Sequence, residues 1–190
     1  FMEDIDTLSF RRRSDLIFYK QVLDVSEIEE IQKELAKYTF KVNDSSLATR
    51  MRITEDDMEE GPLTEIRRSI IRVLSGYFND LKINYIRIYR HSCGETKRHQ
   101  DKSLDGKSNY TLLIYLTDDF EGGKLTLRTK KEEEELAVTD ETKEFFQFTL
   151  ITKIGYGIIF PKHLEHWAPE LIGTKEILIA DLEVSYFEKH

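Results

Sequence analysis

The sequence predicts a mainly β fold in which two helices cover one face of a β-sandwich or a rolled β-helix. Three observations lead to this prediction. Helical apolar periodicity appears twice before residue 80. After Asn79 the chain consists of alternating or apolar runs of strand length, separated by turn residues. Aromatic residues make up 11% of the chain, which is typical of a β-rich core with a lined pocket.

The first part of the chain supplies the helical support. Asp24-Val25-Ser26 supplies a helix start, Ser26 and Glu29 have the spacing of a capping box, and an apolar stripe begins at Ile28. The elements expected here are a strand over Asp15–Leu23, a helix from this cap to about Lys37, an extended stretch over 38–54, an acidic turn over Asp56–Gly61 and a second helix over Pro62–Tyr77.

The second part supplies the sheets. Its predicted strands share alternating or continuous apolar residues, and they are Ile83–His91, Tyr110–Leu116, Lys124–Arg128, Phe145–Lys153, Gly157–Phe160 and Glu176–Tyr186. The segment 130–144 is highly charged and is expected to be a solvated insertion between two strands.

Composition and charge narrow the possible functions. With 190 residues, 39% of them hydrophobic and 34% charged, the chain has the size and composition of one globular domain. A net charge of −8 disfavours binding to nucleic acid or to an anionic membrane, because phosphate contacts need clustered Lys and Arg. A local basic group that could steer an acidic ligand comprises Lys97, Arg98, Lys102 and Lys107.

Cysteine usage and hydropathy bear on location. Cys93 is the one cysteine, so an intrachain disulfide is excluded, which fits a reducing compartment. No apolar run approaches the roughly 18 to 20 residues that a membrane span needs. No signal peptide is visible. We therefore expect a cytoplasmic location without membrane attachment.

The strongest chemical signal is His99 and Asp101 with a histidine far downstream. Residues i and i+2 of a strand share a face, so His99 and Asp101 can reach one metal ion from a strand end or the turn after it. A 2-His-1-carboxylate set holds non-heme Fe(II) and leaves positions open for cosubstrates. His163 and His166 compete for the third place. Lys175 follows His166 by nine residues, a spacing that suits an acidic cosubstrate and favours His166.

Three ordered stretches then carry a family resemblance. They are RIYRHSCGETKRHQD over 87–101, LLIYLTDDFEGG over 112–123, and FPKHLEH over 160–166 followed by GTK over 173–175. The chain resembles Fe(II)- and 2-oxoglutarate-dependent oxygenases of the prolyl 4-hydroxylase type, whose second stretch reads YLNDDFEGG. The resemblance implies a double-stranded β-helix (jelly-roll), with helical support over about 15–80 and a catalytic core over about 81–187.

The resemblance also implies roles for six residues. These are the iron ligands His99, Asp101 and His166, and the 2-oxoglutarate-binding residues Lys175, Tyr115 and Tyr89. The implied cofactors are Fe(II), 2-oxoglutarate and dioxygen, with ascorbate as a reductant. The chain departs from the family at Trp167-Ala168, where Glu-Gly is common, and we expect Trp167 to form an aromatic wall of the substrate pocket. His91 and His190 are expected to be incidental.

The expected function is that of a dioxygenase that hydroxylates a protein or peptide side chain, with proline as the first expectation by resemblance. Two alternatives remain open. The same fold could hydroxylate a free amino acid or another small molecule, or the chain could be a non-catalytic metal-binding interaction module. Nucleic-acid demethylation by the same chemistry is disfavoured by the acidic charge balance.

Overall fold

A computed structural model of the chain describes residues 17–42, 50–130 and 145–187. The helices are α1 (Val25–Leu35) and α2 (Glu60–Leu74), with a 3-10 turn η1 (Glu55–Asp57) before α2. The strands are β1 (Phe18–Gln21), β2 (Lys41–Val42), β3 (Arg50–Thr54), β4 (Phe78–Asn79), β5 (Lys82–His91), β6 (Gly94–His99), β7 (Tyr110–Tyr115), β8 (Glu121–Gly122), β9 (Thr126–Lys130), β10 (Phe145–Thr149), β11 (Tyr156–Pro161), β12 (Glu165–Ile172), β13 (Lys175–Glu183) and β14 (Tyr186–Phe187).

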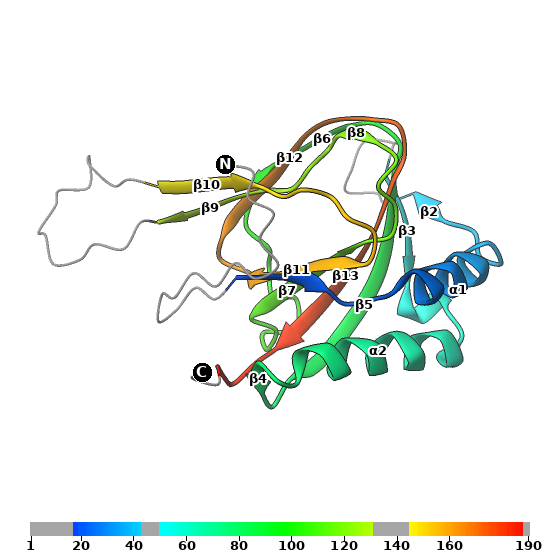
Figure 1. Ribbon diagram of the computed structural model, residues 1–190, viewed down its shortest axis with the longest axis horizontal. Helices are drawn as coiled ribbons and strands as arrows, with labels where there is room; N and C mark the ends of the chain where they lie inside the picture. Colours follow the sequence, from blue (N-terminus) through cyan, green and yellow to red (C-terminus); the bar gives the residue numbers. More distant parts are fainter. Residues whose placement is uncertain (1–16, 43–49, 131–144, 188–190) are drawn as a thin grey trace, which may run out of the picture.

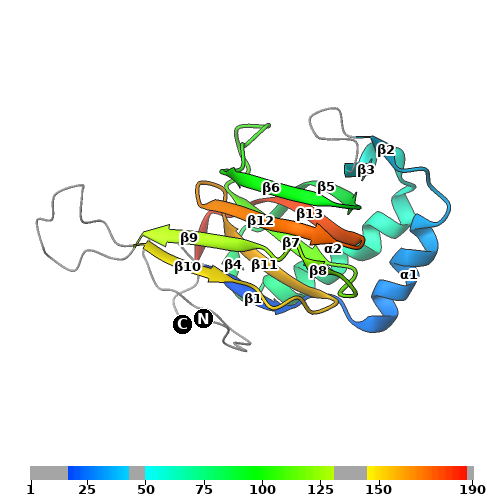
Figure 2. The ribbon, with the colours of Figure 1, turned by 90° about the horizontal axis from the view of Figure 1, so that it is seen from above.

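Two sheets face each other (Figures 1 and 2). The large sheet has seven strands in the order β1-β11-β7-β13-β5-β3-β2. The small sheet has the order β10-β9-β12-β6, with β8 paired to β12. β14 and β4 form a separate ribbon. Figure 1 shows α2 running along the side of the large sheet that points away from the small sheet, with α1 beside it.

The large sheet separates two apolar cores. Strand β7 (YTLLIY) is buried along its whole length, which explains its continuous apolar sequence. Leu112 on one face packs in a cluster with helix residues such as Ile31 and Ile70. Leu113 and Tyr115 on the other face pack in a second cluster, which lies between the two sheets. The period of two along β7 therefore divides the helix side of the large sheet from the side that faces the small sheet.

Helix α1 begins at Val25, within the predicted start, but its capping residue differs from the predicted one. Asp24 is the N-cap: its carboxylate accepts a hydrogen bond from the backbone N–H of Glu27 at 2.8 Å, and the Glu27 carboxylate accepts one from Asp24 at 3.3 Å. The Ser26 hydroxyl donates to Asp24 at 2.8 Å. The predicted capping box at Ser26 and Glu29 is wrong, because Asp caps a helix as well as Ser does and stands two residues earlier.

The prediction lacked two long strands, β6 and β12, as well as the two-residue strands β4 and β8. The sequence of β6 (GETKRH) is polar. Among the described strands, β6 lies at the edge of the small sheet and pairs with β12 alone, and edge strands commonly carry charged residues. β12 contains Pro169, a residue that strands usually lack. The register of β12 against β6 shifts between Ala168 and Leu171, so the proline lies at an irregularity of the ladder.

The predicted mainly β fold with two supporting helices is confirmed. Of the predicted insertion over 130–144, only Lys130 at the end of β9 belongs to the described residues, and His190 also lies outside them. β9 and β10, which flank the insertion, pair in antiparallel register. Within the described ranges, neither helix combines the length and the apolar character that crossing a bilayer requires.

Candidate active site

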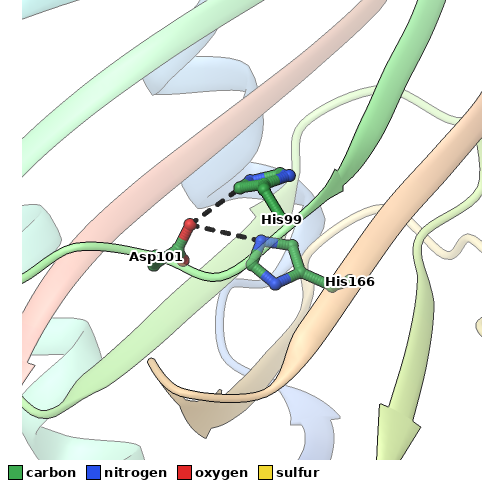
Figure 3. A group of neighbouring side chains, drawn as sticks. All are labelled: His99, Asp101 and His166. Atoms are coloured by element: carbon green, nitrogen blue, oxygen red, sulfur yellow. Dashed lines mark ion pairs between the residues drawn. The ribbon is translucent and has the colours of Figure 1, made fainter.

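Three potential metal ligands converge on the small sheet and the loop after it. His99 ends β6 and lies directly opposite His166 of β12, with ring centroids 4.2 Å apart. Asp101 turns its carboxylate toward both rings (Figure 3). Its Oδ1 lies 3.4 Å from His99 Nε2 and 3.2 Å from His166 Nε2. One ligand atom of each residue lies within 4.8 Å of the other two.

The backbone fixes which ring nitrogen each histidine presents. His99 Nδ1 lies 2.6 Å from the carbonyl oxygen of Lys97, and His166 Nδ1 lies 3.0 Å from that of Leu164. A carbonyl oxygen only accepts, so Nδ1 carries the hydrogen in both rings. In a neutral imidazole, Nε2 then carries the lone pair, and both Nε2 atoms point at Asp101. Such a backbone contact is how proteins orient metal-binding histidines.

The second oxygen of Asp101 is also held. The Thr111 hydroxyl donates to Oδ2 at 2.7 Å. Burial alone would raise the pKa of Asp101, but its contacts with the two imidazoles and the hydrogen bond from Thr111 outweigh burial and hold this pKa well below its usual range. The carboxylate is therefore ionised at neutral pH, as a metal ligand must be.

The three residues line a cavity of about 140 Å³ between the sheets. All six residues predicted to bind iron or 2-oxoglutarate line it: His99, Asp101, His166, Lys175, Tyr115 and Tyr89. The register of the large sheet explains why the last three meet. Ile177 of β13 lies between Tyr89 of β5 and Tyr115 of β7. Lys175, two residues before Ile177, lies on the same face of β13.

Lys175 places a buried cation in this cavity. Lys175 is 5% exposed, and its Nζ donates a hydrogen bond to the carbonyl oxygen of Gly123 at 2.8 Å. Tyr115 is buried, and its hydroxyl oxygen accepts a hydrogen bond from the backbone N–H of Leu125 at 3.3 Å. Burial raises the pKa of Tyr115 to about 12, so the phenol keeps its proton at neutral pH. An ammonium and a phenol in one pocket suit a carboxylate ligand.

Sequence reasoning missed four polar residues of the cavity, Arg87, His91, Thr96 and Thr111. His91, which was expected to be incidental, is outside the ligand group, but it is buried and lies opposite Lys175 on the neighbouring strand. Arg87 donates to the Tyr89 hydroxyl at 3.1 Å. The strand period could have found Arg87 and His91, because both share a face of β5 with Tyr89.

Two neighbouring side chains lie elsewhere. His163 is exposed and is not in the ligand group. The prediction that Trp167 forms a wall of the pocket is wrong. Its neighbours His166 and Ala168 line the cavity, so alternation places Trp167 on the other side of β12. There the guanidinium of Arg98 lies 4.3 Å from the centre of the indole ring.

Comparison with known proteins identifies the fold. The sequence matches no protein-family model and no curated protein sequence. A solved oxidoreductase of the 2OG-Fe(II) oxygenase family from Burkholderia pseudomallei shares 13% identity, covering 90% of this chain and 84% of its own, with a TM-score of 0.61. A Pseudomonas putida prolyl-4-hydroxylase shares 11% identity over 90% of this chain and 93% of its own, with a TM-score of 0.59. HygX from Streptomyces hygroscopicus, solved with nickel, 2-oxoglutarate and hygromycin B, shares 11% identity over 92% and 84%, with a TM-score of 0.62.

The fold is that of the 2OG-Fe(II) oxygenases. The predicted jelly-roll and the resemblance are confirmed at this level. Within the oxygenase fold, the three side chains fit a metal ion. Imidazole and carboxylate ligands lie about 2.0–2.2 Å from a divalent transition metal, so two ligand atoms at right angles are about 3 Å apart. The separations of 3.2 and 3.4 Å from Asp101 Oδ1 to the imidazoles agree with this value. A 2-His-1-carboxylate set favours ferrous iron and leaves positions open.

Proposed function

We propose that the chain is an Fe(II)- and 2-oxoglutarate-dependent dioxygenase and that residues 1–190 form a single oxygenase domain. One observation carries the proposal: the His99–Asp101–His166 group and the buried ammonium of Lys175 line the same cavity. A metal with open positions can bind one end of a 2-oxo acid, and the ammonium suits its far carboxylate. HygX, which shares the fold, was solved with nickel and 2-oxoglutarate, which supports this pairing.

Each residue has a proposed part in the reaction. The proposed iron ligands are His99, Asp101 and His166, and the proposed 2-oxoglutarate contacts are Lys175, Tyr115 and Tyr89. Lys175 fixes the far carboxylate by a charge-assisted hydrogen bond inside a pocket that limits access of water. Bound ferrous iron supplies the oxidative chemistry, in which dioxygen hydroxylates a C–H bond and converts 2-oxoglutarate to succinate and CO2. We propose ascorbate as the reductant that keeps the iron ferrous.

As the substrate we propose a protein or peptide side chain, with proline first. A prolyl-4-hydroxylase is among the proteins that share the fold. The side chain of His99, the last residue of β6, is 42% exposed. Among the described strands, β6 pairs with β12 alone and is therefore an edge strand. An extended peptide can lie along such an edge and reach the ligand group from solvent.

A small-molecule substrate is the second candidate. The cavity volume of about 140 Å³ is small, and HygX was solved with hygromycin B bound. The two candidates differ in where the substrate contacts the protein. A peptide would make most of its contacts outside the cavity, whereas a small molecule would make them at the ligand group itself.

The experiment is succinate formation from 2-oxoglutarate with Fe(II) and ascorbate, measured against proline-containing peptides and against free amino acids. His166→Ala serves as the inactive control. Turnover that rises with a peptide supports the first candidate, and turnover that rises with a free amino acid supports the second. If the native protein binds neither the metal nor 2-oxoglutarate, the proposed function is wrong and a non-catalytic module is the better description.

A further inference from the structure

A buried chain of polar contacts leads from Asp101 into the large sheet. The Thr111 hydroxyl donates to Asp101 Oδ2 at 2.7 Å, and Lys162 Nζ donates to Thr111 Oγ1 at 3.2 Å. Lys162 Nζ also donates to Asp181 Oδ1 at 2.7 Å. Arg87 donates to the two oxygens of Asp181 at 2.8 and 3.4 Å. Thr111, Lys162 and Asp181 are 1%, 5% and 7% exposed, so bulk water cannot replace these contacts.

The chemistry of the groups fixes the direction of the hydrogen bonds. An ammonium has hydrogens to donate and no acceptor, so Thr111 Oγ1 accepts from Lys162. The single hydroxyl hydrogen of Thr111 is then directed to Asp101 Oδ2. With Oδ2 engaged, Oδ1 is the oxygen that faces the two imidazoles. The contacts therefore present Asp101 to a metal through one oxygen.

Lys162 is itself fixed from two sides. A buried ammonium is strongly destabilising without an anionic partner, so Asp181 holds its side chain in place, and Arg87 holds Asp181. The backbone of Lys162 acts on the same ligand, because its carbonyl oxygen accepts a hydrogen bond from the N–H of Asp101 at 3.0 Å. One residue thus restrains Asp101 at the backbone and, through Thr111, at the carboxylate.

We propose that Thr111 and Lys162 are positioning residues that orient the Asp101 carboxylate so that Oδ1 alone faces the metal. The inference rests on the proposed metal site and deepens it, because it assigns a role to two residues that are not ligands. Groups that hydrogen-bond a metal ligand typically contribute about 10- to 100-fold to metal affinity.

Anaerobic titration with Co(II), a redox-stable probe for the iron site, tests the proposal on the full chain. Thr111→Val removes the hydroxyl and leaves Lys162 its partner Asp181. The dissociation constant for Co(II) should rise about 10- to 100-fold, and Thr111→Ser should restore it. Thr126→Val is the matched control, because Thr126 is 2% exposed and its hydroxyl bonds Thr149 at 2.9 Å. This control should keep the native Co(II) affinity.

A double-mutant cycle separates positioning from a general structural role. Lys162→Met leaves Asp181 paired with Arg87 and should weaken Co(II) binding in the native background. In the Thr111→Val background it should add little, because Lys162 acts on the carboxylate side chain through Thr111. A general loss of structural integrity would instead add in the two backgrounds.

The outcomes distinguish the inference from the proposed function. Native Co(II) affinity in Thr111→Val, or additive losses in the cycle, would overturn the inference. If Thr111→Val does not fold, as thermal unfolding of the metal-free protein would show, Lys162→Met decides alone, and native affinity there overturns the inference. If the native protein itself does not bind Co(II), the proposed metal site is wrong.

Discussion

At the scale of the residue, the candidate site depends on which atom each side chain presents. Both histidines are oriented by the carbonyl oxygen two residues before them, Lys97 for His99 and Leu164 for His166. The orientation is therefore local to each strand. The third candidate ligand, Asp101, accepts a hydrogen bond from Thr111, ten residues along the chain. The imidazole geometry follows from short segments, whereas the carboxylate geometry needs the folded sheet.

The competing histidines give a direct prediction. His166→Ala should abolish binding of Co(II) or Fe(II), because it removes one of the three ligand atoms that converge at the site. His163→Ala should keep metal affinity, because His163 is exposed and its backbone carbonyl, which Gln100 uses, is unchanged. Anaerobic metal titration of both variants checks this, and loss of binding in His163→Ala alone would reassign the third ligand.

Lys175 separates cosubstrate affinity from metal affinity. Lys175→Met should raise the dissociation constant for 2-oxoglutarate about 10- to 100-fold, since a hydrogen bond to a charged group contributes about 1.5–3 kcal/mol. Metal affinity should change little, because Lys175 is not in the ligand group. Titration of 2-oxoglutarate into the Co(II)-loaded protein measures the effect, with the exposed Lys107→Met as control. An equal loss in both variants would contradict the assignment of Lys175.

At the scale of the element, sequence patterns predicted the strands whose burial is regular. β7 was expected over Tyr110–Leu116 and is found over Tyr110–Tyr115, because both of its faces are buried and its apolar run is continuous. β6 and β12 were not predicted, because one is a polar edge strand and the other passes through Pro169. The two candidate histidine ligands lie on these unpredicted strands. Chemistry and spacing located them where periodicity could not.

Long-range register explains what else the sequence could not show. Thr111 and Lys162 are far apart in the chain, and their contact depends on the antiparallel pairing of β7 with β11 and β13. Spacing along one strand carries no information about such partners. The polar chain behind Asp101 could therefore be recognised only once the sheets were assembled.

In the turn after β8, Gly123 contacts Lys175, a proposed 2-oxoglutarate-binding residue. Gly122 has φ +64°, and a Cβ there would lie 2.0 Å from the carbonyl oxygen of Glu170. Gly122→Ala should therefore lower stability, by about 1–3 kcal/mol for the backbone conformation alone. It should also weaken 2-oxoglutarate binding, because the next residue, Gly123, supplies the carbonyl oxygen that holds Lys175.

Thermal unfolding and 2-oxoglutarate titration measure both effects of Gly122→Ala. The matched control is Gly61→Ala in α2, where a Cβ meets no atom within 4 Å. That control should be neutral or should stabilise by up to about 1 kcal/mol, because alanine favours a helix over glycine. Unchanged cosubstrate affinity in Gly122→Ala would show that the turn does not control Lys175.

At the scale of the whole molecule, the two sheets contribute different parts of the site. The candidate histidine ligands come from β6 and β12 of the small sheet. The candidate 2-oxoglutarate contacts come from the large sheet: Lys175 on β13, Tyr115 on β7 and Tyr89 on β5. A metal alone would join β6 and β12, which already pair, to Asp101, which is hydrogen-bonded to Thr111 of β7. A metal together with 2-oxoglutarate would join the two sheets across the cavity.

This division predicts an order of stabilisation. Co(II) should raise the thermal midpoint, and 2-oxoglutarate should raise it further only when the metal is present, because one end of the cosubstrate needs the metal. Each ligand at about 100 times its dissociation constant should add about 2.7 kcal/mol. Hydrogen exchange should slow in β6 and β12 with the metal, and near Lys175 at the start of β13 only after 2-oxoglutarate is added. Equal stabilisation by 2-oxoglutarate without metal would show that the cosubstrate does not bridge the sheets through the metal.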